Sequence, residues 1–395
     1  MKLANPSYPD LTTLVTYLRS VDKKYILLYA SNGTGKTRLS MEFKEAGKKN
    51  VDINIVTEDD VFLTTENGDF LVSSESISDT LYFNAFTEDL FYWDNDLEND
   101  VERILLINKY SRFVNALREL EMENKIRPLL QQYSDFNFLF DYEYKDKYGN
   151  EHWAVNFIRE IVVDGSPQNV ENIKVSRSEE NLFIWCFFLA VAQLAIDKQV
   201  GYTWVKNIYI DDPVSSLDEN NVIALAHHLA KMLKADKNEL KTVISTHHSL
   251  FFNVLCNEFG NAPRFVLKKT NSGYALRDTS DSPFQYHLAL VQRIQAAVDT
   301  DNLFTYHFND LRTLLEKAAN FHGFTKFSDC LIVDKDDEEH TLHTRMVNIM
   351  NHGGYSLFEP VEMLDENKIY FKQIFANYKT NYKFNPQLLQ AANEI

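Results

Sequence analysis

The chain has 395 residues, of which 45% are hydrophobic and 13% aromatic, so it can form two or three globular domains with ample cores. Its formal net charge of −17 argues against non-specific wrapping of nucleic acid, and any nucleic-acid contact has to be local and shaped. The three cysteines are widely separated and support neither a disulfide framework nor a zinc site, which favours a cytoplasmic protein.

A strand followed by a glycine-containing turn is the first strong motif. Residues 25–29 form an apolar run typical of a buried strand, and a turn at 31–35 leads into a segment that can be helical. A phosphate-binding P-loop requires this order, with a lysine reaching the phosphates and a hydroxyl ligating Mg²⁺. Ala30 stands where the motif has its first glycine. The predicted nucleotide-binding residues are Asn32, Gly33, Thr34, Gly35, Lys36, Thr37 (also the metal ligand) and Arg38.

The residues around and after this loop predict further elements. A short helix is expected within residues 1–20. Residues 51–56 and 80–86 alternate like strands, and Asn67-Gly68 is typical of a hairpin turn between them. Residues 97–132 have the apolar spacing of one or two amphipathic helices. Strands are predicted again at 136–148 and 152–163.

Residues 182–196 are the most apolar stretch of the chain, and Ser176 stands just before it. Fifteen residues are too few to span a bilayer, so we expect a core helix and no membrane contact. A serine followed by glutamates at a helix start is a good N-cap, and on local grounds this structural role is the better explanation of Ser176.

Two later strands end in polar side chains. The strand predicted at 206–211 ends in Asp211 and Asp212, and the one at 241–246 ends in His247. An aspartate at the end of an apolar strand beside a P-loop is how the Mg²⁺ of a nucleotide is held. An isolated histidine after a strand is usually structural, but here it follows an ordered series of motifs.

This series resembles the ATP-binding-cassette class of NTPases over about residues 20–270. The resemblance implies a nucleotide-sandwich dimer or higher oligomer and the following roles: Asp211 as metal ligand, Asp212 as catalytic base, Ser176 and Arg177 in the signature segment, Asp218 in the D-loop and His247 as switch histidine. Glu88 is the nearest candidate for the Q-loop. Since the family has glutamate where Asp212 stands, and a shorter side chain reaches water less well, we expect slow hydrolysis.

A narrower resemblance rests on Asn84-Ala-Phe-Thr-Glu-Asp-Leu-Phe, Val175-Ser-Arg-Ser-Glu-Glu-Asn and Ile210-Asp-Asp-Pro-Val-Ser-Ser-Leu-Asp. With these segments the chain resembles the PrrC-type bacterial anticodon nucleases. That family implies an α/β ABC-type P-loop NTPase domain at 1–280, with a short helical insertion at about 97–132, and a small, mostly α-helical C-terminal ribonuclease domain at 285–395. It also implies ATP or GTP with Mg²⁺, dTTP as a stabilising nucleotide, cleavage of the tRNA-Lys anticodon loop, a type I restriction-modification complex as silencer, and a role in phage defence.

The C-terminal region contains the candidate nuclease residues. Helices are predicted at 287–298 and 303–321, and Arg312 and Glu316 stand four apart on the second. By spacing alone they are an ordinary surface ion pair. The family resemblance instead implies a metal-independent site with a later histidine, for which we choose His352, with His343 and His340 as alternatives.

The three side chains would divide the cleavage chemistry between them. A carboxylate can take the 2′-OH proton, a histidine can protonate the leaving 5′-oxygen, and arginine can stabilise the phosphorane, giving 2′,3′-cyclic phosphate and 5′-OH ends.

Two alternatives stay open for this region. Lysines alternate with aromatic residues over 368–384, which suits a single-stranded RNA loop but equally suits an amphipathic helix with solvated lysines. For the whole chain, the alternative function is a non-nucleolytic ABC ATPase sensor that activates a separate effector.

Overall fold

The computed structural model describes residues 6–54, 72–84, 90–94, 104–108, 120–146, 148–163, 166–214, 217, 219–279, 286–330, 349 and 361–382. The chain divides into two compact units, Met1–Pro283 and Phe284–Ile395. Each unit is described by itself below.

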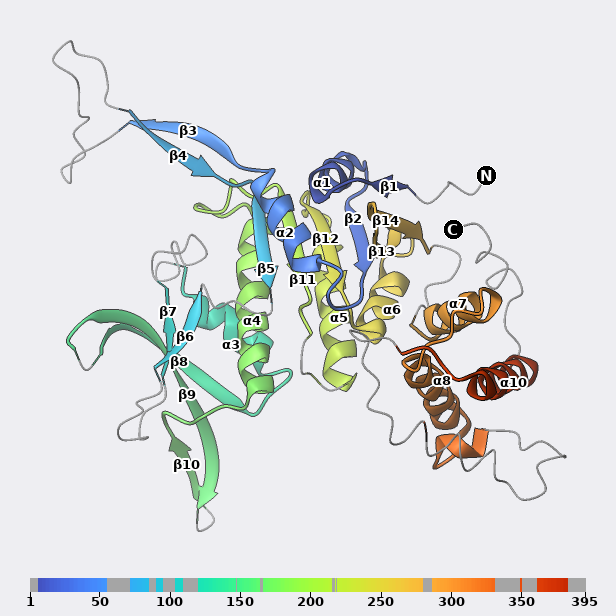
Figure 1. The fold of residues 1–395 in the computed structure, drawn as a ribbon. Coiled ribbons are helices and arrows are strands. Elements are labelled where there is room, and N and C mark those ends of the chain that lie inside the picture. Colours follow the sequence, from blue (N-terminus) through green and yellow to red (C-terminus); the bar gives the residue numbers. More distant parts are fainter. Residues whose placement is uncertain are drawn as a thin grey trace. The chain divides into compact units, whose positions relative to one another are not determined.

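A seven-stranded sheet forms the centre of the first unit, with the order β1-β14-β13-β2-β12-β11-β5 (Figure 1). Its strands are β1 (Ser7–Tyr8), β2 (Tyr25–Tyr29), β5 (Thr80–Asn84), β11 (Asn207–Asp211), β12 (Lys241–Thr246), β13 (Arg264–Thr270) and β14 (Gly273–Asp278). The five strands from β13 to β5 pair in parallel, whereas β14 and β1 are antiparallel to their neighbours. The carboxyl ends of the parallel strands therefore meet at one edge, where ligands bind in open α/β sheets.

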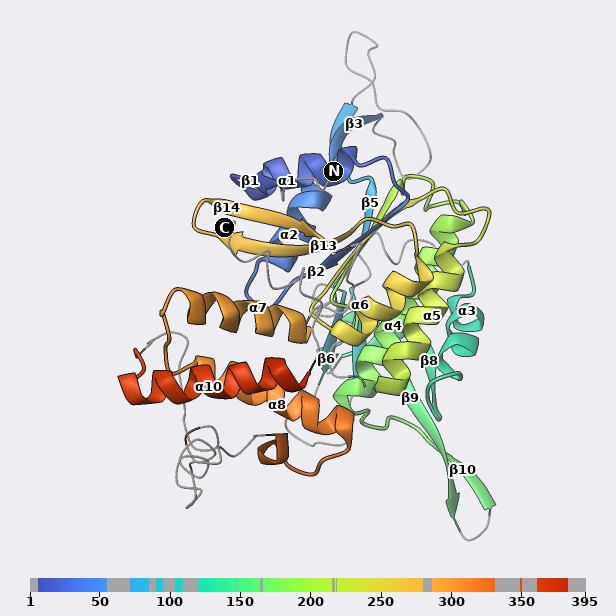
Figure 2. The same cartoon turned by 90° about the vertical axis from the view of Figure 1, so that its right-hand side faces the viewer.

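Helices cover both faces of this sheet (Figure 2). They are α1 (Leu11–Ser20) and α2 (Lys36–Glu45) on one face, and α4 (Arg177–Ile196), α5 (Glu219–Leu233) and α6 (Ser249–Glu258) on the other. Side chains of β2 alternate between the two layers: Ile26 and Leu28 pack in the α1–α2 layer, and Leu27 and Tyr29 in the other. A strand buried on both faces reads as a continuous apolar run, which is why residues 25–29 predicted a central strand.

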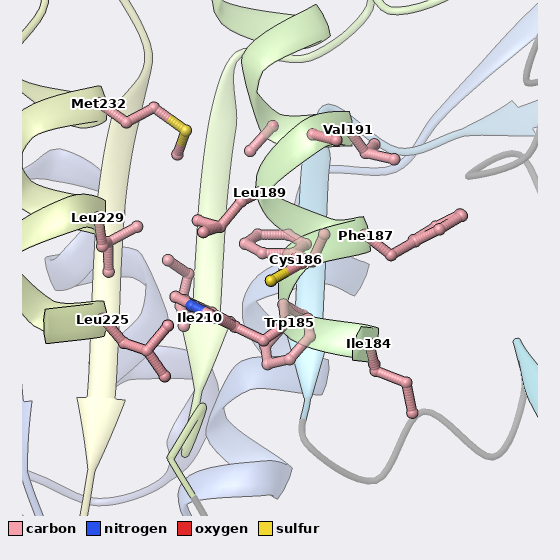
Figure 3. Packing of buried hydrophobic residues seen from close by; sticks show 14 of the residues in the cluster. Ile184, Trp185, Cys186, Phe187, Leu189, Val191, Ile210, Leu225, Leu229 and Met232 are labelled. Carbon is pink, nitrogen blue, oxygen red and sulfur yellow. The ribbon is translucent and has the colours of Figure 1, made fainter. Parts of the chain in front are cut away.

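Helix α4 is apolar around its whole circumference because it is packed on several sides. Figure 3 shows Leu225 and Leu229 of α5 directed toward Ile210 and toward one side of α4, while Phe187 and Val191 point to the opposite side of α4. By length and composition α4 could cross a membrane, but 78% of its most apolar window is buried inside the protein. The predicted core helix is confirmed, and it begins five residues earlier than residue 182.

An antiparallel sheet packs against α4 in the same core. It consists of β6 (Phe91–Asp94), β7 (Ile104–Ile107), β8 (Phe136–Lys145), β9 (Glu151–Val163) and β10 (Ser166–Val170), together with the short helix α3 (Met122–Leu130) beside it. The strands predicted at 136–148 and 152–163 are confirmed. Of the one or two helices predicted over 97–132, α3 is confirmed, whereas Ile104–Ile107 forms a strand with all four side chains buried; residues 97–103 and 109–119 lie outside the described residues. A short apolar run of this kind fits a buried strand as well as a helix.

The hairpin predicted between residues 51–56 and 80–86 is wrong in its pairing. Strand β3 (Lys49–Asn54) pairs with β4 (Val72–Ile77), and β5 instead lies beside β11 in the main sheet. Residues 67 and 68, the predicted turn, lie outside the described residues. The strand β4 was not predicted because Val72–Ile77 is mostly polar and has weak periodicity. β5 lies in the main sheet because Thr80–Asn84 has the apolar side chains that a buried parallel strand needs.

The second unit has a helical core. It contains α7 (Tyr286–Asp299), α8 (His307–His322), the 3₁₀ helix η2 (Phe327–Cys330) and α10 (Asp365–Asn381). Buried apolar side chains of these helices form one cluster, centred on Leu311, Leu314 and Phe371. The helices predicted at 287–298 and 303–321 are confirmed as α7 and α8.

Candidate functional site

The glycine-containing loop lies at the carboxyl end of β2 and leads directly into α2. Gly33 and Gly35 have φ angles of +79° and +102°, a left-handed conformation that glycine adopts without a Cβ penalty. Gly35 is the N-cap of α2, and no side chain of the described residues caps that helix. The first N–H groups of α2 are therefore available to an anion, as at other helix N-termini that bind phosphate. Asn32, Thr37 and Arg38 are exposed, and Thr34 is half-buried.

Lys36 is folded back onto this loop. Its Nζ lies 3.1 Å from the carbonyl oxygen of Ala30, 3.4 Å from that of Ser31 and 3.4 Å from Oδ1 of Asn32. It also lies 3.1 Å from Oδ2 of Asp212, and only 6% of its side chain is exposed. The P-loop lysine thus pairs with the carboxylate at the predicted base position.

Asp211, the last residue of β11, is almost completely buried under hydroxyl groups. Ser245 Oγ donates to its Oδ1 at 2.7 Å, and Ser40 Oγ lies 3.4 Å from its Oδ2. The Thr37 hydroxyl also hydrogen-bonds to this carboxylate. Burial raises the pKa of Asp211, the charge of Asp212 adds to the rise, and these hydrogen bonds only partly oppose it.

Asp212 has a φ angle of +49°, in the left-handed region. It contacts Ser245 of β12 and His247, the residue that follows β12. Its N–H donates to the carbonyl oxygen of Ser245 at 2.8 Å. Its Oδ1 accepts from the backbone N–H of His247 at 2.7 Å, and His247 Nδ1 lies 2.7 Å from the same oxygen. Burial would raise the pKa of Asp212, but the hydrogen bonds from His247 and the charge of Lys36 outweigh burial, and the pKa is lowered.

The Asp211 and Thr37 oxygens suit a Mg²⁺ ion that arrives with a nucleotide. Mg²⁺ is usually bound by one or two protein oxygens plus substrate phosphates and waters, and not by a full protein cage. The described residues contain no group of three or more His, Cys, Asp or Glu side chains that could hold a metal. A hydroxyl and a carboxylate in mutual contact provide the oxygen donors that this ion takes.

Ser176 and Arg177 lie at the N-terminus of α4 and are exposed. Ser176 caps the helix: its N–H donates to Glu179 Oε2 at 2.7 Å, and its Oγ accepts from the Glu179 N–H at 3.3 Å. The local explanation, a capping box, is therefore confirmed, and Arg159 adds an ion pair to Glu179. A cavity of about 720 Å³ lies beside this helix end, lined by Tyr133, Ser134, Asp135, Ser178, Glu179, Leu182, Leu217 and Asn221. Asp218 and Glu88 lie outside the described residues.

In the second unit, Arg312 and Glu316 lie on one face of α8. Arg312 Nε donates to Glu316 Oε1 at 2.8 Å, and the two side chains are 35% and 44% exposed. The Arg312 guanidinium also lies over the ring of Phe327, 5.4 Å from its centroid, within cation–π range. Spacing predicted this ion pair, whereas the contact with Phe327 was missed. His352, His343 and His340 lie outside the described residues.

The aromatic residues of α10 belong mainly to the core of the second unit. Phe371, Phe375 and Tyr378 are buried, as the amphipathic-helix alternative predicts. Two lysines of the same helix have partners: Lys368 pairs with Glu362 at 2.6 Å, and Lys372 with Asp301 at 2.7 Å. The described part of α10 therefore gives little support to a base-stacking surface.

Sequence reasoning missed the hydroxyl residues around Asp211. Ser40 and Ser245 have no motif of their own, and only the pairing of β11 with β12 brings Ser245 to Asp211. One signal was available, because a serine in an apolar strand is a polar group that needs a buried partner.

Comparisons with known proteins agree with these features. A family model described as an AAA domain matches residues 158–379. Over 378 residues the chain is 34% identical to a protein of Escherichia coli named anticodon nuclease, covering 91% of this chain and 90% of that protein. It is 22% identical over 351 residues to a Staphylococcus aureus (strain MRSA252) protein named as an uncharacterized protein of the SCCmec type IVc chromosomal cassette, covering 81% of this chain and 42% of that protein.

Solved structures include two SMC head domains that align with parts of the chain. The head domain from Thermotoga maritima has a TM-score of 0.31 and 11% identity, covering 65% of this chain and 90% of that one. The head domain with a coiled coil and joint derived from Pyrococcus yayanosii has a TM-score of 0.30 and 12% identity, covering 43% of this chain and 29% of that one.

Proposed function

The chain belongs to the anticodon nuclease family and carries an ATPase domain, and from this premise we propose that it is a nucleotide-gated ribonuclease that cleaves a tRNA anticodon loop. The first unit binds ATP or GTP with Mg²⁺, and the second unit cuts RNA. The domain boundary lies at about 280–285. The observation that carries the proposal is the 34% identity over nine-tenths of both chains, to which the assembled nucleotide site adds independent support.

The nucleotide part of the proposal assigns a task to each residue at the edge of the main sheet. Lys36 and the N–H groups of α2 bind the phosphates, and Thr37 and Asp211 hold Mg²⁺. When bound, Mg²⁺ neutralises charge on the phosphates. Asp212 orients the attacking water and His247 orients Asp212, which is supported by their 2.7 Å contact. Because aspartate reaches less far than glutamate, hydrolysis is slow and acts as a timer.

The assembly proposed for the nucleotide site is a dimer or a higher oligomer. Ser176, Arg177 and Asp218 of a second copy close over the nucleotide. The exposed position of Ser176 and Arg177 at the end of α4 is compatible with such a contact.

The ribonuclease reaction needs no metal. Glu316 accepts the proton of the ribose 2′-hydroxyl, and the 2′-oxygen then attacks phosphorus. The bond from phosphorus to the 5′-oxygen breaks as His352 gives its proton to that oxygen, and Arg312 stabilises the charge on the phosphorane. The products are a 2′,3′-cyclic phosphate and a 5′-hydroxyl, so a strand with 2′-deoxyribose at the cleavage position stays intact.

The test uses the full chain with a pool of tRNAs, and the RNA ends are sequenced after incubation with ATP or GTP. Cleavage in the anticodon loop should survive EDTA once nucleotide is bound, and should disappear in Glu316→Gln and His352→Ala. Lys317→Ala is the matched control, because Lys317 is an exposed neighbour on the same helix. Nucleotide binding without any RNA cleavage by the wild type would contradict the proposal and favour an ATPase sensor that activates a separate effector.

Family resemblance extends the proposal to the biological setting. The preferred substrate is tRNA-Lys, dTTP is a stabilising nucleotide, and a type I restriction-modification complex keeps the cytoplasmic enzyme silent until phage infection. Purification with and without such a complex, followed by cleavage of single tRNA species, tests these assignments separately. Equal cleavage of all tRNAs would contradict the substrate assignment alone.

A further inference from the structure

The buried carboxylate of Asp211 receives hydroxyl groups from two elements that are far apart in the sequence. Ser245 of β12 donates to Oδ1 at 2.7 Å, and Ser40 of α2 lies 3.4 Å from Oδ2. All three residues are almost inaccessible to solvent. A carboxylate in this position has few alternative orientations, because any rotation would break a buried hydrogen bond that water cannot replace.

The two hydroxyls are not equivalent. A serine has one hydrogen to donate, and Ser40 has a closer acceptor in the carbonyl oxygen of Thr37, at 2.8 Å, than in Asp211. Ser40 also lies 3.2 Å from the hydroxyl of Tyr82. The Ser245 hydroxyl donates to Asp211 Oδ1 at 2.7 Å, a shorter distance than the 3.4 Å from Ser40 Oγ to Oδ2. Ser245 is therefore the stronger donor to this carboxylate.

Strand register explains why Ser245 reaches Asp211. The two residues are direct partners in the parallel pair β11–β12, so their side chains point to the same face of the sheet, the face covered by α1 and α2. The carbonyl oxygen of Ser245 also accepts from the N–H of Asp212 at 2.8 Å. One residue thus contacts both carboxylate residues at the end of β11.

We propose that Ser245 is a positioning residue for the metal site: its hydroxyl fixes Oδ1 of Asp211, so that Oδ2 stays directed toward α2, where Thr37 and the Mg²⁺–nucleotide bind. Groups that orient a metal ligand in this way commonly change metal affinity by about 10- to 100-fold when removed. The inference rests on the proposed nucleotide-binding role of the first unit and is independent of RNA cleavage.

The test measures metal binding and not turnover. Mn²⁺ is titrated into the full chain with a saturating non-hydrolysable ATP or GTP analogue, and free Mn²⁺ is followed by electron paramagnetic resonance. Ser245→Ala should weaken Mn²⁺ binding about 10- to 100-fold and leave the affinity for the metal-free analogue unchanged. Ser245→Cys keeps a similar side-chain volume but has only a weak S–H donor, so its loss of Mn²⁺ affinity should lie between those of the wild type and Ser245→Ala. This variant provides the test if Ser245→Ala does not fold.

The matched control is Thr242→Val, on the same strand. Thr242 is fully buried, and its hydroxyl has no hydrogen-bond partner among the described residues. The Thr242→Val variant should bind Mn²⁺ with the affinity of the wild type. Folded Ser245 variants with wild-type Mn²⁺ affinity, or with an equal loss of metal-free nucleotide affinity, would overturn the positioning role. Failure of the wild type itself to bind the Mn²⁺–nucleotide would instead contradict the proposed nucleotide site.

Discussion

Neutralising Asp212 should tighten nucleotide binding while it stops hydrolysis. In the structure, Lys36 Nζ lies 3.1 Å from Asp212 Oδ2, and the two side chains are only 6% and 16% exposed. A P-loop lysine has to reach the β- and γ-phosphates, so binding must turn this amine away from Asp212. Asp212→Asn removes the charge that holds the amine back and keeps the size of the side chain.

The geometry sets the size of the effect. At an effective dielectric constant of about 20, two charges at this distance attract each other by about 5 kcal/mol in gross terms. Most of that is offset, because the amine regains an anionic partner in the phosphate and keeps nearby loop oxygens. We expect a net gain of about 1–2 kcal/mol, which is a decrease of about 5- to 30-fold in Kd.

Calorimetric titration with a non-hydrolysable analogue measures this change, and phosphate release measures hydrolysis. His247→Ala is the control. His247 contacts Oδ1 of Asp212 and has no contact with Lys36 among the described hydrogen bonds and ion pairs. This variant should therefore hydrolyse nucleotide more slowly but bind the analogue no more tightly than the wild type. An Asp212→Asn protein that melts like the wild type and binds the analogue no more tightly would refute the reasoning.

Three further outcomes follow from single contacts. Burial lowers the pKa of His307 to about 4. The unfolded chain takes up this proton near pH 6.5, so the free energy of unfolding should fall by about 3 kcal/mol as the pH is lowered from 6.5 to 4. Melting curves of His307→Gln should therefore depend less steeply on pH in this range. Gly273→Ala should lower the free energy of unfolding by about 1–3 kcal/mol, because a Cβ would lie 2.1 Å from the Tyr8 carbonyl oxygen. Gly201→Ala is the control: Gly201 also has a positive φ, but no described atom lies within 4 Å of its Cβ, so the loss should be smaller. Equal melting temperatures of the two variants would contradict this. Glu316→Gln should abolish cleavage. Because the substitution frees Arg312 from its 2.8 Å ion pair with Glu316, the variant should bind RNA at least as tightly as the wild type in a filter assay. Weaker RNA binding would contradict the proposed role of Arg312.

The arrangement of the candidate nucleotide site was largely predictable because its parts have strong local signals. The strand, turn and helix from Tyr25 to Glu45 follow from apolar runs and from two glycines that the structure places at positive φ. Strand β11 ends in Asp211, and β12 has a buried centre and is followed directly by His247, so their ends could be recognised. Parallel neighbours then bring Asp211, Asp212 and His247 to one edge without further information.

The rest depends on pairing between distant segments, which local patterns do not encode. Whether Ile104–Ile107 is a strand or a helical turn is decided by β6 and β9 on either side of it. The contact of Ser245 with Asp211 joins residues 34 apart and requires the register of two strands. Phe327 reaches Arg312 only because η2 folds back onto α8. In each case the side chain is ordinary in sequence and informative only once its neighbour is known.

Each candidate site contains an ion pair. Lys36 pairs with Asp212 in the first unit, and Arg312 pairs with Glu316 in the second. In each pair the cation is the group proposed to bind a phosphate, and the carboxylate is the group proposed to accept or orient a proton. A phosphate oxyanion competes with the carboxylate for the cation, so the binding of substrate itself frees the base. If these assignments hold, binding of a phosphate at Lys36 or at Arg312 would leave the charge of the neighbouring carboxylate unopposed, so each proposed base would gain its role from the binding of its own substrate.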